Sequence, residues 1–202
     1  FQEILDGAAE MDAHVFDTPL EKNIAFRAAC VQSLNRLYGM KTYALIPYGR
    51  RLQLLPAFLQ QLEMESNGKG VDAEGRKLKR SSAAVTWGDA GTNAQPSFFQ
   101  LLHQGRDVTP VEFLLIERGS EGPSSHRNML IANVLAQAQA LYEGKTEAVA
   151  KQELLDKGEA PERAAALAPH RAFTGDRPCT VIGLDALTPK TLGALMAFYE
   201  HR

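Results

Sequence analysis

The sequence predicts an α/β domain in which a mainly parallel sheet is covered by helices on both faces. Short apolar runs alternate with segments of helical periodicity through the middle and end of the chain. These runs are apolar throughout rather than alternating, which is typical of strands that are buried on both faces. The 202 residues, 45% of them hydrophobic, are enough for one substantial core or two small ones.

Two helices are expected before the first strand. Residues 1–15 place apolar side chains on one helical face. Thr18 then suits the N-cap of a second helix, Pro19 its first position, and Glu21 closes a capping box. That helix should continue to about residue 37.

A strand and a third helix should follow. The apolar run 42–47 is bounded by turn-forming residues and is typical of a buried strand. Leu55, Phe58 and Leu62 are spaced i, i+3, i+7, which predicts a buried helical stripe. The dipeptide at 67–68, Asn-Gly, is expected to end this helix.

The last turn of that helix carries a carboxylate and an amide side by side. Gln61 and Glu65 are four residues apart and therefore share a face. Glu63 lies roughly 200° round an α-helix from Glu65, so we expect it in solvent. From the spacing alone, such a pair is more often a solvent-exposed pair without a function than part of a functional site.

The remaining elements follow the same alternation of strands and helices. After a loop or short hairpin at 68–82, we expect a strand at 83–87, a turn at 88–93 and a helix at 96–103. A strand at 111–116, a polar loop at 118–125 and a long helix at 125–142 should follow. The chain should then form two short helices within 145–168, a strand at 179–184 and a last helix from 188–189. Ligands of such folds gather at the carboxyl ends of the strands. The loops after Pro47, Trp87, Ile116 and Leu184 are therefore the expected place for a site.

The turn at 88–93 is rich in glycine and enters a helix, an arrangement that can hold an anion. Its pattern matches neither the dinucleotide fingerprint nor a P-loop. A structural role is favoured, and a phosphate site is the alternative.

Composition and charge exclude several classes of function. The net charge of −2 offers no basic field for nucleic acid or anionic membrane. No apolar run reaches the ~20 residues of a membrane span, and the acidic start is unlike a signal peptide. Cys30 and Cys179 lie in apolar stretches and should be buried thiols of a cytoplasmic protein. No histidine or cysteine spacing indicates a metal site.

Several long stretches, in order along the chain, resemble one family. The segment at 61–69 resembles QxxMESNGK of the phosphoglucose isomerase (glucose-6-phosphate isomerase) family, and others resemble WGEPGTNGQ at 87–95, FYQLxHQG at 98–105, ANFxAQxxAL at 132–141, LTPxTLGAL at 187–195 and YEH at 199–201. The resemblance covers nearly all of the chain.

The resemblance implies a fold and a place in the whole protein. Residues 1–202 would form the second sugar-isomerase (SIS) domain, a three-layer α/β/α unit, truncated at both ends. The first SIS domain with its phosphate loop, and a C-terminal segment with an active-site lysine, would be absent, so this piece alone should be inactive. The family is cytoplasmic, homodimeric, free of metal and cofactor, and acts in glycolysis and gluconeogenesis.

The resemblance also implies a chemistry. The family interconverts glucose 6-phosphate and fructose 6-phosphate through a cis-enediol, with one carboxylate moving the proton between C2 and C1. That base would be Glu65, and Gln61 would contact the sugar phosphate.

One position departs from the family pattern. The family opens the sugar ring with a histidine that follows GTNGQ, and here that position is Pro96, which we expect at the start of the helix 96–103. The ring could open in water, another group could replace the imidazole, or the protein could be a non-catalytic sugar-phosphate-binding or regulatory module. His103 and His126 are the nearest replacement candidates, although His103 is expected to be structural and His126 exposed.

Overall fold

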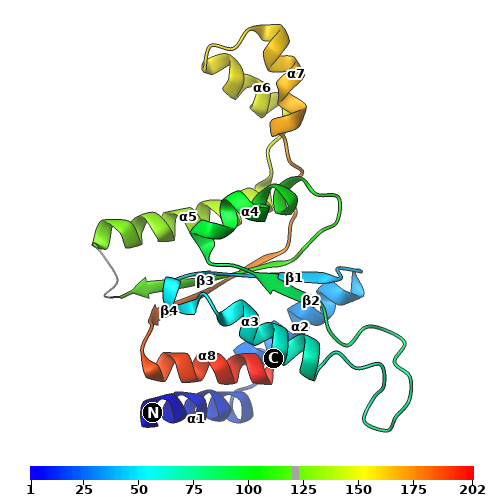
Figure 1. Cartoon of the computed structure of the whole chain (residues 1–202), viewed down its shortest axis with the longest axis vertical. Coiled ribbons are helices and arrows are strands. Elements are labelled where there is room, and N and C mark those ends of the chain that lie inside the picture. Colours follow the sequence, from blue (N-terminus) through cyan, green and yellow to red (C-terminus); the bar gives the residue numbers. More distant parts are fainter. Residues whose placement is uncertain (120–122) are drawn as a thin grey trace.

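The protein is built on four parallel strands in the order β2-β1-β3-β4 (Figure 1). This computed structural model describes residues 1–119 and 123–202, so the middle of the polar loop expected at 118–125 lies outside the described residues. The strands are β1 (Thr42–Tyr48), β2 (Val85–Gly88), β3 (Val111–Arg118) and β4 (Cys179–Ala186). The expected α/β class and all four expected strands are confirmed.

Both faces of the central strands are buried. On β1, Ala44 and Ile46 pack into the core on one side of the sheet, while Tyr43 and Leu45 pack into the core on the other. Strand β3 divides in the same way, with Phe113 on the first side and Leu114 on the second. Uniformly apolar strands are therefore what two helical layers require.

Helices cover the sheet on both sides, as Figure 1 shows. Helices α4 (Gly91–Gln104) and α5 (Ser124–Glu143) cover one face. The other face is covered by α2 (Ile24–Leu37), the short η1 (Arg50–Leu52), α3 (Leu55–Leu59) and its continuation η2 (Gln60–Ser66), and α8 (Pro189–His201). Helix α1 (Gln2–Asp17) lies outside α8, where a Cβ at Gly7 would come within 1.8 Å of the Lys190 carbonyl oxygen. No helix in the described ranges is long and apolar enough to cross a membrane.

Helices α6 (Glu147–Asp156) and α7 (Pro161–Arg171) form a hairpin that stands away from the body of the molecule (Figure 1). The Thr146 hydroxyl caps α6 by accepting from the Val149 amide at 3.3 Å. At the base, Lys145 and Phe173 exchange two backbone hydrogen bonds of 2.8 and 2.9 Å. The two expected short helices are thus confirmed as one projecting unit.

The second helix begins later than the capping pattern predicts. Its N-cap is Asn23, whose side chain accepts from the Phe26 amide at 3.1 Å and donates to the Val15 carbonyl at 2.8 Å. Thr18 instead ends α1, where its hydroxyl pairs with His14 Nδ1 at 3.1 Å. Asn23 rather than Thr18 caps this helix because its side-chain amide also forms a hydrogen bond to α1.

Helix α4 begins at Gly91, so the expected start at Pro96 is wrong. The Ala94 amide already donates to the Ala90 carbonyl at 2.9 Å. Pro96 is an exposed residue inside the helix, where it removes only the hydrogen bond that would have reached the Thr92 carbonyl. Cys30 also differs from expectation, because it is exposed rather than buried, while Cys179 is half-buried.

Candidate functional site

The helix end that carries Gln61 and Glu65 is wound as a π-helix, η2. Both side chains are exposed, and neither has a hydrogen-bond partner in the described part of the chain. The Lys69 ammonium donates to the Glu65 carbonyl oxygen at 2.8 Å, so a positive charge lies against the end of this segment. A free carboxylate and a free amide are thus presented to solvent on one short segment, and π-helical turns are frequent at functional sites.

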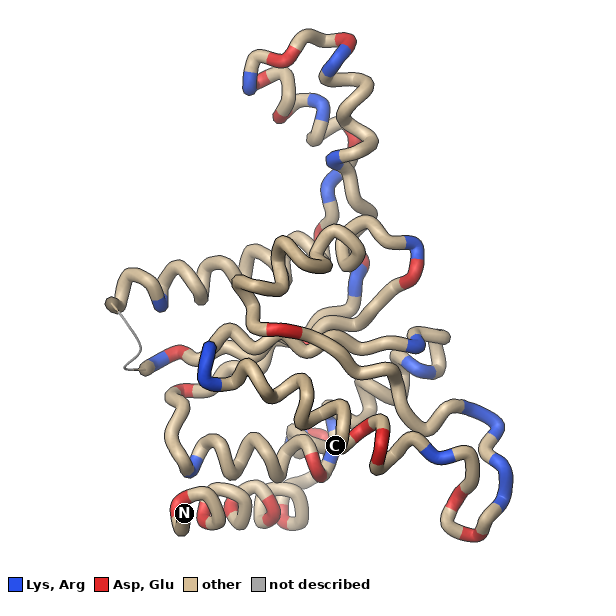
Figure 2. Tube along the Cα trace, viewed as in Figure 1, with Lys and Arg blue, Asp and Glu red and all other residues tan. Residues whose placement is uncertain are grey.

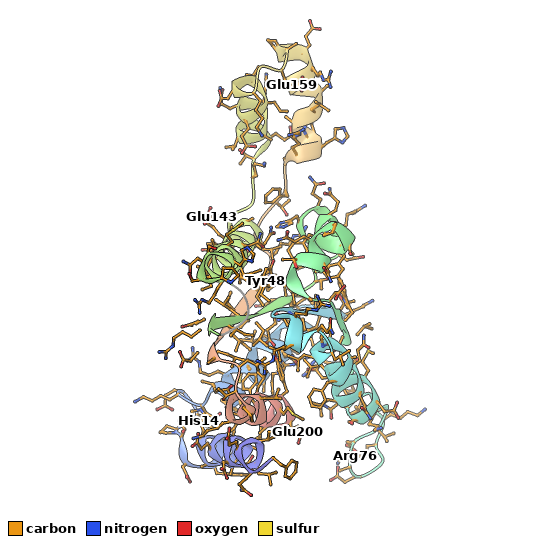
Figure 3. The ribbon with its side chains drawn as sticks, turned by 60° about the vertical axis from the view of Figure 1, so that its left-hand side comes forward. His14, Tyr48, Arg76, Glu143, Glu159 and Glu200 are labelled. Atoms are coloured by element: carbon orange, nitrogen blue, oxygen red, sulfur yellow. The ribbon has the colours of Figure 1, made fainter. Side chains whose placement is uncertain are left out.

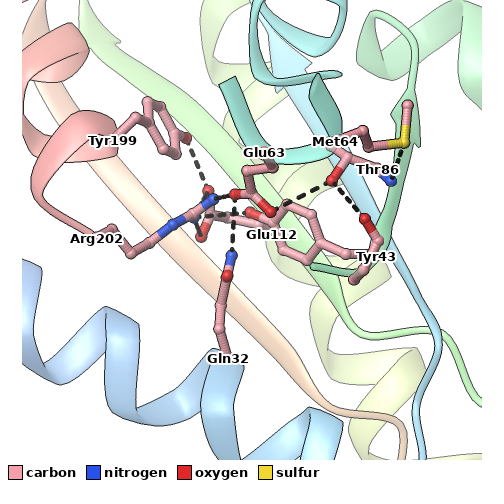
Figure 4. A network of polar contacts seen from close by, with 9 residues as sticks. Gln32, Tyr43, Glu63, Met64, Thr86, Glu112, Tyr199 and Arg202 are labelled. Atoms are coloured by element: carbon pink, nitrogen blue, oxygen red, sulfur yellow. Dashed lines mark hydrogen bonds and ion pairs between the residues drawn. The ribbon is translucent and has the colours of Figure 1, made fainter. Parts of the chain in front are cut away.

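Strand β2 holds this segment in place through Thr86. The Thr86 amide donates to Met64 Sδ at 3.3 Å, and its hydroxyl donates to Glu63 at 3.3 Å (Figure 4). The Thr86 carbonyl in turn accepts from the Gln60 side chain at 3.2 Å. The anchored residues are Gln60, Glu63 and Met64, which lie directly before and between Gln61 and Glu65. The exposed pair is therefore carried by an anchored backbone.

Glu63 is buried, which corrects the expectation that it faces solvent. Its side chain is 9% exposed and pairs with Arg202, whose side chain is 1% exposed. Arg202 also contacts Glu112 of β3 at 3.0 Å. An unpaired buried carboxylate would be costly, so Glu63 is stable there only because the guanidinium neutralises it.

Two tyrosines and a glutamine complete this buried charge cluster (Figure 4). Tyr199 donates to Glu112 at 2.7 Å, Arg202 donates to the Tyr43 hydroxyl at 3.0 Å, and the Gln32 amide, with its oxygen toward Arg202, accepts at 2.8 Å. Burial raises the pKa of both tyrosines well above the ordinary value, and Glu112 raises it further. Burial alone would lower the pKa of Arg202, but Glu112 and its other partners raise it overall. These shifts keep both tyrosines neutral and Arg202 charged.

The candidate replacements for the missing imidazole lie away from Glu65. Helices α4 and α5 cover the face of the sheet opposite to α3 and η2, and they carry Pro96, His103 and His126. His103 is half-buried, pairs with Gln137 at 3.0 Å and has a pKa lowered by burial. These features fit the expected structural role. His126 is exposed at the start of α5. Among the described residues, no hydrogen bond or ion pair joins a histidine to Glu65.

A cavity of about 610 Å³ lies at the carboxyl ends of all four strands. Residues from every expected loop line it, including Gly49, Ala90, Gly119 and Leu187. Neither Gln61 nor Glu65 borders it, because η2 ends at the opposite, amino edge of the sheet. The candidate base and the loops at the strand ends therefore lie at opposite edges of the sheet. Across the described ranges, no group of three histidine, cysteine or acidic side chains could hold a metal ion.

The buried charge cluster was missed in the sequence. Glu112 was the available signal, because a carboxylate inside an apolar strand run needs a partner. Its partner is 90 positions further along the chain, and no local pattern connects the two.

Comparisons with known proteins agree with the sequence motifs. The family model of phosphoglucose isomerase matches residues 1–202. Glucose-6-phosphate isomerases of Caulobacter sp. (strain K31) and Methylocella silvestris are 48% and 46% identical over the whole chain, which spans 38% and 37% of their lengths. A crystal structure of a glucose-6-phosphate isomerase from Chlamydia trachomatis superposes with a TM-score of 0.83 at 37% identity, over 98% of this chain and 36% of that one. The chain thus spans little more than a third of these relatives.

Proposed function

The chain belongs to the phosphoglucose isomerase family, and on this premise we propose that the complete protein interconverts glucose 6-phosphate and fructose 6-phosphate. Residues 1–202 contribute its second sugar-isomerase domain. The observation that carries the proposal is the exposed Glu65, free of partners and held on an anchored helix end. Relatives named glucose-6-phosphate isomerase align with the whole of this region.

Glu65 is proposed as the catalytic base. A free carboxylate can take the proton from C2 of the open-chain sugar and return it to C1, on one face of a cis-enediol. Gln61 would position the sugar, since an amide can both donate to and accept from its hydroxyl groups. The hydrogen bonds of Thr86 to Gln60, Glu63 and Met64 fix the segment that carries both side chains, and such positioning favours the transfer.

Ring opening is the step for which this chain offers no group. Pro96 cannot transfer a proton, and His103 and His126 lie on helices that cover the opposite face of the sheet from Glu65. We propose that the sugar phosphate binds with its ring already opened in water, or that a group outside residues 1–202 opens it. The complete protein is proposed to be a cytoplasmic homodimer, so that a partner subunit could supply such a group.

The test is an isomerase assay of the complete protein. Glu65→Gln should lower kcat by about 10²–10⁴-fold, the usual contribution of general base catalysis. Glu200→Gln, which removes an exposed carboxylate of α8 (labelled in Figure 3), is the matched control and should leave kcat unchanged. Wild-type turnover by Glu65→Gln would refute the assignment.

The alternative function is that of a non-catalytic sugar-phosphate-binding module. The observation that suggests it is Pro96, which replaces the histidine of the family pattern. The Pro96→His variant distinguishes the two. If wild type binds glucose 6-phosphate without converting it and only Pro96→His turns it over, the binding module is correct. If wild type is active and the variant is at most a few times faster, isomerase function holds.

A further inference from the structure

We propose that the cavity at the carboxyl edge of the sheet is a second anion site, separate from Glu65, which binds the phosphate group of a small soluble phosphate ester. Its volume of about 610 Å³ is in the range of small-molecule sites. It is bordered by all four strand ends and lies where the strand order reverses between β1 and β3, the usual ligand position in open parallel sheets.

Among the described lining residues of the cavity, the charged side chains are arginines. Arg50, Arg51, Arg127 and His126 line it, and none of the lining residues that the structure describes is a carboxylate. The whole chain, in contrast, has a net charge of −2, and Figure 2 shows acidic positions gathered along α1. A cavity lined by Arg50 and Arg127, with no carboxylate among its described lining residues, is complementary to an anion.

Two described carboxylates at the ends of strands β2 and β4 are already engaged. Asp89 accepts from the neighbouring Ala90 amide, and Asp185 at the end of β4 forms an ion pair with Arg118. Arg127 uses one nitrogen to reach the Gly119 carbonyl at 3.1 Å, which aligns its guanidinium along the wall. The Arg50 guanidinium is exposed and has no partner among the described residues. Two arginine side chains therefore remain able to bind a ligand oxygen.

Backbone donors face the same space. The first turn of α4, Gly91 to Asn93, lines the cavity, and its N-cap Ala90 offers no side chain to its free amides. Helix α8 begins at the same edge, but there Thr188 accepts from the Thr191 amide at 3.1 Å. The uncapped turn adds directed N–H groups to the arginines, a combination suited to phosphate.

Close packing shapes the cavity floor. A Cβ at Gly91 would lie 2.3 Å from the ring of Tyr48, and one at Gly49 would lie 2.6 Å from Ile116 Cδ1. Tyr48 is in turn fixed by Asn133, whose side chain accepts from its hydroxyl at 2.8 Å. Tyr48 and Ile116 therefore form a closely packed, largely apolar part of the lining beside the arginines, as in a site that holds a phosphate and a small organic body.

The test is protection of arginine side chains from phenylglyoxal in the complete protein, read for each residue by peptide mass spectrometry. Inorganic pyrophosphate is the probe, and citrate is the carboxylate comparison. Pyrophosphate should slow modification of Arg50 and Arg127 but not of Arg80 and Arg106, which are exposed and lie outside the cavity. Equal slowing at all four arginines, no slowing at any, or stronger protection by citrate would each overturn the proposal.

A variant then tests whether the two arginines share one ligand. In Arg50→Gln, half-protection of Arg127 should need about tenfold more pyrophosphate, the effect of losing one charged hydrogen bond. Arg80→Gln carries the same charge change and should leave protection of Arg127 as in wild type. If Arg50→Gln also leaves it unchanged, the arginines do not form one site and the proposal fails.

Discussion

Charged side chains are buried and paired at the amino edge of the sheet, whereas at the carboxyl edge they are exposed around a cavity. At the amino edge, Glu63, Glu112 and Arg202 are buried, paired and fixed. At the carboxyl edge, Arg50 is exposed and faces a cavity that no described carboxylate lines. The comparison teaches that the buried charges position a segment, whereas charges without partners are available to a ligand. The following predictions test this contrast, in order of decreasing effect.

The largest effect is expected from removing the cation of the amino edge. Arg202→Met leaves Glu63 and Glu112 buried without a counter-charge, which should destabilise the protein by about 3–5 kcal/mol. Urea denaturation of the complete protein measures the change. Arg50→Met removes a cation from the opposite edge and should change stability by less than about 0.5 kcal/mol. Similar losses for the two variants would abolish the contrast.

A steric change at the carboxyl edge should have a smaller effect. Gly91→Ala would place a methyl group 2.3 Å from the Tyr48 ring, and overpacking of this kind costs about 1–3 kcal/mol. Gly70→Ala is the control, since nothing lies within 4 Å of its added Cβ. Thermal unfolding of both variants compares the two glycines. If Gly91→Ala unfolds at the same temperature as wild type, the Tyr48 ring can move to accommodate the added methyl group.

The anchor between the strand and the candidate catalytic segment should contribute less. Thr86→Val removes the hydroxyl that donates to Glu63 but keeps the backbone contact with Met64. We expect a loss of stability of about 0.5–1.5 kcal/mol. Because the segment loosens, kcat should also fall, whereas Thr92→Val at the other edge should not alter it. An unchanged kcat in Thr86→Val would separate the anchor from the function.

The smallest effect concerns a half-buried group on the face covered by α4 and α5. Burial lowers the pKa of His103 below 6.5, so the unfolded chain takes up a proton before the folded protein does. The stability that His103 contributes is therefore complete above pH 6.5 and is lost as the pH falls through the lowered pKa. His103→Gln should reduce the slope of stability between pH 7 and pH 5. A wild-type slope in His103→Gln would contradict the prediction.

The layered fold could be predicted because its signals are local. Uniformly apolar runs such as 111–116 indicate a strand buried on both faces, whatever the rest of the chain does. The predicted start of the second helix was wrong because Asn23 caps this helix and also forms a hydrogen bond to the Val15 carbonyl of α1. A capping motif at Thr18 cannot reveal that competing contact.

The candidate site could be predicted only in part. The motif around Glu65 led to the family, but no local pattern showed that Glu63 has a partner for its charge. Arg202, 139 positions further along the chain, is that partner and makes the burial of Glu63 possible. The arginines of the carboxyl edge drew no hypothesis, because their meaning depends on a cavity that forms only when four strand ends meet.

The α6–α7 hairpin has a consequence for the order of folding. Lys145 and Phe173 close its base through paired backbone hydrogen bonds, so all its internal contacts join residues close together in the sequence. Such local units form quickly, whereas the parallel sheet must pair β3 with β1 and with β4, which come from distant parts of the chain. The hairpin can therefore be in place before the sheet closes, and changes in its length should leave the rate of sheet assembly nearly unaltered.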